Sequence, residues 1–313
     1  MTPIRIALVG LGKIARDQHC PALAGNPAFE LVAGASPHSR IEGLPCYPDI
    51  ESMFDHVSPI SAVALCTTPQ VRFETARYAL AQGCDVLLEK PPGRAVSEVT
   101  ALRGLAERQG AVLYASWHSR HARAVGAARS WLAGRRLRDV SVHWQEDVRV
   151  WHPGQRWIWQ PGGLGVFDPG INALSILTQL VSGSLALREA VLSYPENCET
   201  PIAADLQLAD CDDTPIRMTL DFLHAGEPRW DIRVVTDAGC LLLTHGGRDL
   251  EIDGRPWEVE RGEEYPSLYA HFADLIGLRR SDVDLAPLQL VADAFLCGRR
   301  VEVAPFIEPA IRS

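Results

Sequence analysis

The first 115 residues alternate short apolar runs with segments of helical periodicity. A continuous apolar run is typical of a strand that is buried on both faces of a parallel sheet. Such runs predict strands at Ile4–Val9, Phe29–Ala35, Ala62–Cys66, Val86–Leu88 and Ala111–Ala115. Apolar residues between them recur at helical spacing, which predicts helices at about 12–25, 49–57, 70–82 and 97–109. Strands that alternate with helices indicate a doubly wound parallel sheet.

The pattern changes after about residue 120. A helix is predicted at 121–134, and several later segments alternate apolar with polar residues, as strands with one buried face do. These predicted strands contain Val140/Val142/Trp144, Ala203/Leu206/Leu208, Ile216/Met218/Leu220, Ile232/Val234 and Leu241/Leu243. Helices predicted at 169–182, 266–278 and 286–297 are expected to cover the resulting sheet. The chain is therefore predicted to have the α/β class, with a parallel-sheet domain at 1–120. An α+β domain with a large, mostly antiparallel sheet follows at 121–313.

Composition narrows the class of protein without naming a reaction. The chain has 313 residues, of which 47% are hydrophobic and 22% charged, as expected of a globular protein with two domains. Its net charge of −9 argues against a nucleic-acid partner. No apolar run reaches the roughly 18 residues that span a bilayer, and no signal-peptide pattern is present, so we expect a cytoplasmic protein without membrane contact. The cysteines show no zinc-ligand spacing, and no metal site is predicted.

A glycine-rich sequence, GLGKIA at 10–15, follows the first predicted strand. Gly10 permits a tight turn, Gly12 lets main-chain amides approach a pyrophosphate, and Ala15 allows close packing of helix and strand. The position between a strand and a helix predicts a dinucleotide site in a Rossmann domain. The alternative is a glycine-rich turn that binds no ligand.

The end of the second predicted strand indicates which dinucleotide binds. An NAD site usually places a carboxylate there for the ribose hydroxyls. This sequence has none in the segment 35–40, whereas Ser36, His38, Ser39 and Arg40 are able to donate to a 2′-phosphate. The pattern favours NADP, with NAD as an alternative. A polar turn that happens to lack an acid would have the same sequence.

Lys90 lies directly after the strand predicted at Val86–Leu88, in the sequence EKPPG. Ligands of open α/β sheets bind at the carboxyl ends of the strands. An ammonium group there would lie near a nicotinamide ring, where it can bind the reacting oxygen or lose a proton. The prolines that follow would fix its direction and allow a cis peptide bond. The alternative is a solvated lysine at a strand end.

A tryptophan-rich stretch at 151–159 is a candidate surface for a sugar. Indole rings offer an apolar face together with one hydrogen-bond donor. Packing between domains would explain the same residues. His118 follows the strand predicted at Ala111–Ala115 and would face the ligand edge of the sheet, although a lone histidine is more often a polar surface residue.

Asp168 and Asn172 are four residues apart, so they share one face of a predicted helix. A carboxylate and an amide at this place can hold and deprotonate a hydroxyl group. The alternative is that Asp168 caps the helix, with Pro169 at the first helical position.

Together these motifs resemble the glucose–fructose oxidoreductase/inositol dehydrogenase family over nearly the whole chain. The resemblance rests on the glycine-rich turn, the EKP sequence at 89–91 and the helix start at 167–172, in this order. It implies hydride transfer between NAD(P) and a sugar or polyol carbon. The segments 118–120, 151–155 and 167–172 look like those of bacterial aldose 1-dehydrogenases, which oxidise L-arabinose or D-galactose to a lactone. Family members often pair through the open sheet face, so a homo-oligomer stays open.

The motifs and the resemblance give three sets of candidate residues. The catalytic candidates are Lys90, Asp168 and Asn172. The cofactor candidates are Gly10, Gly12, Lys13, Ile14, Ser36, His38, Arg40, Thr67, Pro69, Glu89 and Lys90. The candidates for contact with the sugar are His118, Glu146 or Asp147, Trp151, His152, Asp168, Asn172 and Trp230.

One position departs from the family pattern. Asn172 stands where the family usually has histidine, and a neutral amide cannot act as a base near pH 7. The proton acceptor is then Asp168, Lys90 or water. Two other functions stay open on this sequence: a non-catalytic sensor of sugars or dinucleotides with the same fold, and a dehydrogenase of the same family that oxidises a polyol.

Overall fold

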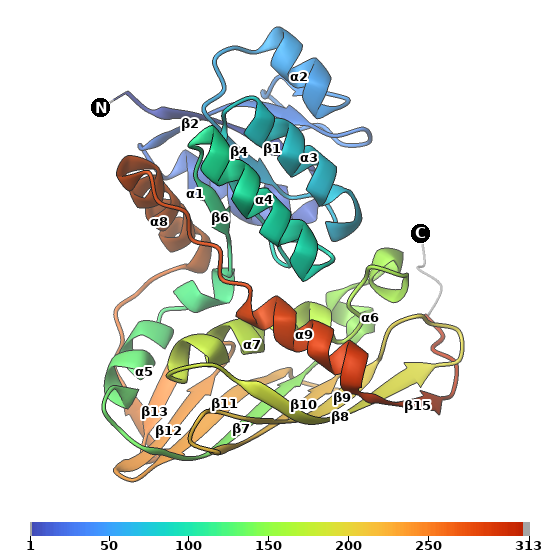
Figure 1. Ribbon diagram of the computed structural model, residues 1–313, viewed down its shortest axis with the longest axis vertical. Coiled ribbons are helices and arrows are strands. Elements are labelled where there is room, and N and C mark those ends of the chain that lie inside the picture. Colours follow the sequence, from blue (N-terminus) through green and yellow to red (C-terminus); the bar gives the residue numbers. More distant parts are fainter. Residues whose placement is uncertain (1, 309–313) are drawn as a thin grey trace. The chain divides into compact units, whose positions relative to one another are not determined.

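Six parallel strands form the first sheet, in the order β3-β2-β1-β4-β5-β6 (Figure 1). The computed structural model describes residues 2–308. The strands are β1 (Ile4–Val9), β2 (Phe29–Ala35), β3 (Cys46–Tyr47), β4 (Ala62–Leu65), β5 (Asp85–Leu88) and β6 (Leu113–Ala115). The predicted parallel sheet is confirmed, and β4 and β5 are fully buried along their length, as central parallel strands are. β3 was not predicted, because two residues are too short to form a recognisable apolar run.

Helices connect these strands near the predicted positions. They are η1 (Ala15–His19), α1 (Cys20–Ala24), α2 (Ile50–His56), α3 (Pro69–Ala81) and α4 (Val96–Gln109). The helix predicted at 12–25 contains a π-helical turn, η1, which ends two residues before Pro21. Proline lacks an N–H group and clashes with the carbonyl group four residues earlier in a regular helix, so the wider turn accommodates it.

One helix that packs against the first sheet lies far along the chain from its strands. The apolar face of α8 (Glu264–Leu278) packs into the core beneath this sheet. That core contains Ile6, Leu8, Ala64, Tyr265, Leu268, Tyr269 and Phe272. The prediction that this helix covers the antiparallel sheet is wrong, because apolar spacing shows which face of a helix is buried and not which core receives it.

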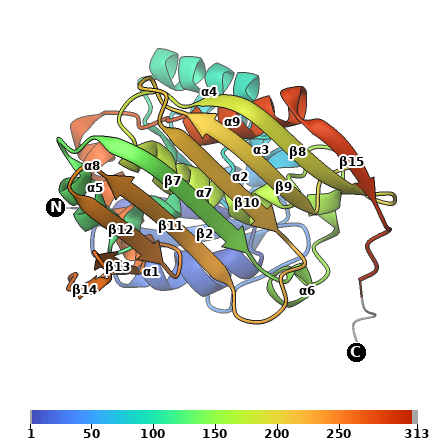
Figure 2. The same cartoon turned by 90° about the horizontal axis from the view of Figure 1, so that it is seen from below.

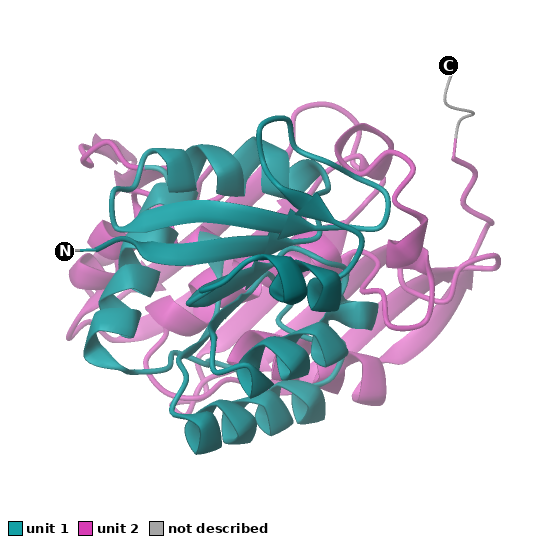
Figure 3. Cartoon of the chain, turned by 90° about the horizontal axis from the view of Figure 1, so that it is seen from above, with its two compact units in different colours: residues 1–118, 263–285 teal, residues 119–262, 286–313 magenta. Residues whose placement is uncertain are grey.

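The chain forms two compact units, which Figure 3 distinguishes by colour. Residues 1–118 and 263–285 make up the first unit, and residues 119–262 and 286–313 the second unit. A single division at residue 120 therefore does not describe these units, because the segment that carries α8 returns to the first.

Nine strands form the sheet of the second unit, in the order β14-β13-β12-β11-β7-β10-β9-β8-β15 (Figure 2). They are β7 (Leu137–Gln145), β8 (Ala186–Pro195), β9 (Ala203–Ala209), β10 (Pro215–Asp221), β11 (Arg229–Thr236), β12 (Gly239–Thr244), β13 (Asp249–Ile252), β14 (Arg255–Trp257) and β15 (Arg299–Val303). β7 pairs parallel with β10, and β8 with β15, while the other neighbouring strands are antiparallel. The predicted, mostly antiparallel sheet is confirmed.

Sequence patterns identified the inner strands of this sheet better than the outer ones. In β7, buried Val140, Val142 and Trp144 alternate with partly exposed residues. β8, β13, β14 and β15 were not predicted. Two of them, β14 and β15, are the edge strands, where charged or polar residues interrupt an apolar pattern.

Helices of the second unit lie on one face of this sheet (Figure 1). They include α5 (Val125–Leu132), α7 (Phe167–Leu180) and α9 (Ala286–Cys297). Short helical segments η2 (His118–His121), α6 (Val148–Trp151) and η3 (Arg156–Trp159) occur in the loops. Across residues 2–308, no helix is both long and apolar enough to cross a membrane.

The start of α7 differs from the prediction. The helix begins at Phe167, and Val166 is its N-cap. Asp168 lies inside the first turn, so the prediction that it caps the helix is wrong. Val166 and Phe167 are fully buried, and the N–H group of Val166 donates to the main-chain oxygen of Pro201, so apolar packing begins the helix earlier. Asp168 and Asn172 still lie one turn apart on one helix.

Candidate functional site

The glycine-rich turn after β1 leaves space for a ligand at its main chain. Gly10 has a φ of +90°, and a Cβ there would lie 2.7 Å from the main-chain nitrogen of Thr67, so only glycine fits. A Cβ at Gly12 would meet no protein atom within 4 Å. Packing of the protein itself does not require glycine at this second position, so the open space suits the approach of a pyrophosphate. The exposed residues that follow are Lys13 and Ile14.

The turn after β2 carries a cation and no carboxylate. Ser36 is buried at the end of the strand, and His38 is exposed. The Nη1 atom of Arg40 donates to the main-chain oxygens of Ser36, at 2.6 Å, and Ser39, at 3.0 Å. The guanidinium group is thus held at this strand end, where its charge suits a phosphate.

Two polar side chains after β4 lack hydrogen-bond partners. The hydroxyl of Thr67 and both amide atoms of Gln70 are buried, and within residues 2–308 none of the three has a partner. An unsatisfied buried polar group costs about 1–3 kcal/mol, so these atoms fit a site that a polar ligand completes. Pro69 is the first residue of α3. Sequence reasoning selected Thr67 and Pro69 but missed Gln70, whose proximity to them was the available signal.

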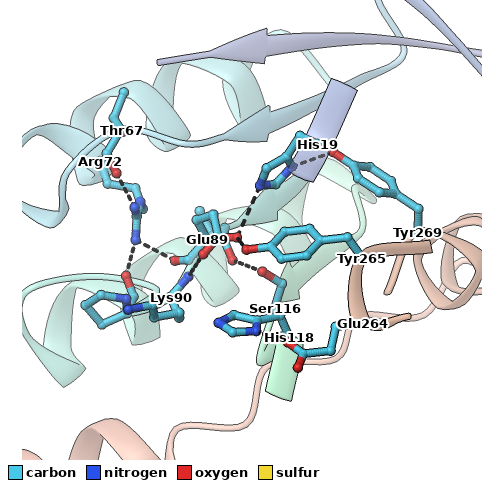
Figure 4. Close-up of polar contacts among 12 residues, drawn as sticks. His19, Thr67, Arg72, Glu89, Lys90, Ser116, His118, Glu264, Tyr265 and Tyr269 are labelled. Carbon is cyan, nitrogen blue, oxygen red and sulfur yellow. Dashed lines mark hydrogen bonds and ion pairs between the residues drawn. The ribbon is translucent and has the colours of Figure 1, made fainter. Parts of the chain in front are cut away.

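Buried polar side chains form a hydrogen-bond network around Glu89, the residue that precedes Lys90 (Figure 4). Glu89 is 3% exposed, and its Oε1 accepts a hydrogen bond from the hydroxyl of Tyr265 at 2.6 Å. The same oxygen lies 3.1 Å from Nε2 of His19, whose Nδ1 lies 2.7 Å from the hydroxyl of Tyr269. We call His19, Glu89, Tyr265 and Tyr269 the Glu89 network. It connects the residue that follows β5 with η1 and α8.

Buried groups hold the main chain on both sides of Lys90 (Figure 4). Oε2 of Glu89 accepts a hydrogen bond from the N–H group of Lys90 at 2.7 Å. Arg72, a buried residue of α3, donates to the main-chain oxygens of Thr67, Glu89 and Pro91. The Lys90–Pro91 peptide bond is cis. The backbone from which the Lys90 side chain extends is therefore fixed by its surroundings before any ligand binds.

Neighbouring groups keep the acid and the imidazole of the Glu89 network ionised. Burial raises the pKa of Glu89, but the hydrogen bond and the charge of His19 outweigh burial and hold this pKa well below its usual value. Burial lowers the pKa of His19, but interactions with Cys66, Tyr269 and Glu89 outweigh burial and hold this pKa well above its usual value. Burial and the Glu89 carboxylate raise the pKa of Tyr265, so its hydroxyl stays protonated and donates.

These shifts predict how stability depends on pH. Stability from His19 is fully present below about pH 6.5, its unfolded pKa, and is lost as pH rises through the raised folded pKa. Stability from Glu89 is fully present above about pH 4.3 and is lost as pH falls towards the lowered folded pKa. We expect His19→Gln to flatten the decrease in the free energy of unfolding above pH 6.5, measured by urea denaturation at a series of pH values.

The matched control is His56→Gln, because His56 is an exposed histidine of the same unit. It should keep the alkaline slope of the wild type. An alkaline slope in His19→Gln as steep as that of the wild type would show that the buried imidazole does not retain its proton.

A second set of buried polar side chains surrounds His152 in the second unit. Glu146, which follows β7, is 2% exposed, and its Oε1 lies 2.8 Å from Nε2 of His152. Oε2 of Glu146 accepts a hydrogen bond from the indole nitrogen of Trp230 at 2.8 Å. Oδ2 of Asp168, a residue that is 3% exposed, lies 3.8 Å from Nδ1 of His152. We call Glu146, His152, Asp168 and Trp230 the His152 cluster.

Other sequence candidates of the second unit lie around this cluster. Asn172 is partly exposed, one helical turn after Asp168. Trp151 is 46% exposed and meets Trp230 edge to face, with ring centroids 4.9 Å apart. Asp147 caps α6 and forms an ion pair with the arginine two residues later, at 2.7 Å. Of the two acidic candidates, Glu146 is therefore the one that enters the cluster.

His118 lies in the first unit, beside the Glu89 network. Its ring stacks on that of Tyr265, with centroids 5.4 Å apart, and its Nδ1 pairs with Glu264. Sequence reasoning missed His19 and Tyr265. His19 follows buried Ala15 by four residues on one helix face, a spacing that indicates burial, whereas no local signal links Tyr265 to Glu89.

Comparisons with known proteins identify relatives of this chain. Residues 4–116 match the family model GFO_IDH_MocA, described as an oxidoreductase family with an NAD-binding Rossmann fold. Galactose 1-dehydrogenase of Pseudomonas fluorescens is 45% identical over 312 residues, which cover 98% of this chain and 100% of that protein.

Solved structures extend the similarity to the whole fold. The crystal structure of a D-galactose-1-dehydrogenase protein from Rhizobium etli is 52% identical, with a TM-score of 0.95 over 98% of this chain and 99% of that one. KijD10, a 3-ketoreductase from Actinomadura kijaniata solved with NADP and TDP-benzene, shares the fold at 17% identity and a TM-score of 0.83, over 96% of this chain and 99% of that one. This chain belongs to the GFO_IDH_MocA oxidoreductase family, the family that its motifs resemble.

Proposed function

We propose that this protein catalyses the NAD(P)-dependent oxidation of an aldose at its anomeric carbon, with an aldonolactone as product. D-Galactose and L-arabinose are the first substrates to test, the former because two whole-length relatives are galactose 1-dehydrogenases. The observation that carries the proposal is that buried Glu89 and Arg72 hold the main chain at Lys90, at the carboxyl end of β5. We call these two residues the clamp on Lys90. It lies in a sheet whose glycine turn has open space for a dinucleotide.

In this proposal, the bound nicotinamide supplies the hydride acceptor. The protein's own residues place the sugar and move one proton. The ammonium group of Lys90 binds the reacting oxygen. The carboxylate of Asp168 accepts the proton of the anomeric hydroxyl as its oxygen becomes a carbonyl oxygen. Asn172 holds the sugar by hydrogen bonds, because an amide donates and accepts them but takes no proton.

The test is reduction of NAD or NADP during incubation with a panel of sugars, followed by the absorbance of the reduced nicotinamide. The panel contains D-galactose, L-arabinose, D-glucose and a polyol such as inositol. We expect reduction with an aldose and formation of its lactone, detected as the hydroxamate. Binding of sugar and dinucleotide without any reduction would refute the proposal and favour a sensor. Reduction with the polyol alone would place the oxidised carbon elsewhere.

For the cofactor, we propose a preference for NADP with NAD also accepted. Support comes from the guanidinium of Arg40 over the turn after β2 and from the lack of a carboxylate there. Ser36→Asp should raise the KM for NADP by about 10- to 100-fold, roughly 1.4–2.8 kcal/mol, because its charge would repel a 2′-phosphate. The KM for NAD should rise less or fall, since NAD lacks that phosphate.

Ser36→Ala is the matched control, because it removes the hydroxyl without adding a charge. It should change the two KM values by similar small factors. Equal losses for NAD and NADP in Ser36→Asp would place the 2′-phosphate away from this turn.

A further inference from the structure

His152 has one ring nitrogen that is bonded and one that is buried without a hydrogen bond. Its Nε2 lies 2.8 Å from Oε1 of Glu146. Its Nδ1 is buried and has no hydrogen-bond partner among residues 2–308. Oδ2 of Asp168 lies 3.8 Å from this nitrogen, which is within reach of an ion pair but longer than a hydrogen bond.

The neighbours of the ring fix its tautomer. A neutral imidazole has one N–H donor and one acceptor nitrogen, and a carboxylate can only accept. The proton of neutral His152 is therefore on Nε2, facing Glu146, and the lone pair is on Nδ1, facing Asp168. A base whose far nitrogen is oriented by a carboxylate is the arrangement that nucleophile and proton-transfer sites use.

Both carboxylate oxygens of Glu146 have partners in the His152 cluster. One of its oxygens meets His152 and the other accepts the indole N–H group of Trp230. At 2% exposure, its charge has little contact with water. A positive charge on His152 would compensate a buried carboxylate, which is otherwise costly. The contact with Glu146 therefore holds the ring with Nδ1 on the side of Asp168.

In the proposed reaction, Asp168 must pass its proton to another group. In the proposed oxidation, each turnover leaves one proton on its carboxylate, which must be lost before the next. The side chain of Asp168 is 5% exposed, whereas that of His152 is 16% exposed. Asn172 cannot take the proton, because it is an amide. The ring of His152 offers a nitrogen lone pair on this side, because its Nδ1 lies 3.8 Å from Oδ2 of Asp168.

We propose that His152 is the proton acceptor of the second unit, which relays the proton from Asp168, with Glu146 as its positioning residue. The inference rests on the proposed aldose oxidation. The O–H bond of the anomeric hydroxyl breaks, and its proton passes to Asp168 Oδ2 and then to His152 Nδ1. The C–H electron pair leaves as hydride to the bound nicotinamide, and a C=O bond forms. The 3.8 Å separation shortens when substrate binds, as catalytic hydrogen bonds commonly do.

The test compares His152→Gln with the wild type, with D-galactose or whichever aldose the wild type oxidises best. Glutamine keeps an N–H donor for Glu146 but offers no basic nitrogen to Asp168. We expect kcat to fall by about 100-fold or more. The dissociation constant of the sugar, from quenching of tryptophan fluorescence, should change by less than about threefold, roughly 0.65 kcal/mol. The solvent deuterium isotope effect on kcat should rise, because removal of the proton becomes rate-limiting.

Two further variants make the result specific. Glu146→Gln should also lower kcat more than it weakens sugar binding, because the imidazolium loses its counter-charge, and it tests the same relay if His152→Gln does not fold. His143→Gln, a change of a partly exposed histidine on β7, should leave kcat and the isotope effect at wild-type values.

The outcomes separate this inference from the proposed function. A wild type that oxidises no aldose refutes both. An active wild type with His152→Gln at near-normal kcat keeps the function and overturns the relay. Weaker sugar binding at unchanged kcat would make His152 a sugar contact only, which also overturns the relay.

Discussion

Asp168→Asn should lower the turnover of aldose oxidation by about 10²–10⁴-fold and leave the thermal midpoint almost unchanged. Asparagine has nearly the same shape as aspartate but cannot accept a proton. Asp168 is buried in the first turn of α7, and Val166 rather than Asp168 is the N-cap, so no helix cap is lost. Steady-state kinetics and thermal denaturation of the same preparation provide the two measurements.

Asn172→Ala is the companion variant on the same helix face. Because an amide only places the sugar, this change should raise KM more than it lowers kcat. Full activity of Asp168→Asn on every aldose tested would return the helix start to a structural role and remove the proton acceptor from the proposed mechanism.

Lys90→Ala should lower kcat by about 10²–10⁴-fold, while the dissociation constant of NADP changes little. The reason is that the clamp formed by Glu89 and Arg72 holds the backbone of Lys90, so loss of the ammonium group removes a partner of the reacting oxygen without moving the strand end. Lys90→Arg should recover only part of the activity, because a guanidinium group is larger and keeps its proton. Titration with NADP and steady-state kinetics separate binding from turnover.

Arg94→Ala is the control for a nearby positive charge. Arg94 is exposed and forms an ion pair with Glu98, so its removal should leave kcat within about twofold. Near-normal turnover of Lys90→Ala would show that Lys90 takes no part in the reaction.

The strands of the first unit were predictable because their burial on both faces shows in the sequence of each strand itself. Ile4–Val9 and Phe29–Ala35 have the predicted bounds, since parallel strands covered on both faces need continuous apolar runs. α8 was predicted as a helix, but its destination was not, because its apolar stripe fits any core. Edge strands such as β15 carry arginine and glutamate and give no periodic signal.

The candidate site shows a similar division. The glycine turn and Lys90 were found from sequence because each depends on neighbours in the chain, a strand before and a helix or proline after. The function of Glu89 in holding Lys90 depends on Tyr265 and His19, which approach it only in the folded protein. Likewise, the orientation of His152 towards Asp168 follows from the packing of a loop against α7, which no spacing in the sequence encodes.

The return of α8 also has a consequence for synthesis on the ribosome. When residue 118 has emerged, all six strands of the first sheet are present, but the core beneath them still lacks Leu268, Tyr269 and Phe272. The strands from β7 to β14 emerge before those side chains do. The two units therefore complete their folding in an interleaved order instead of one after the other, and a nascent chain released early exposes the apolar faces that α8 would have covered.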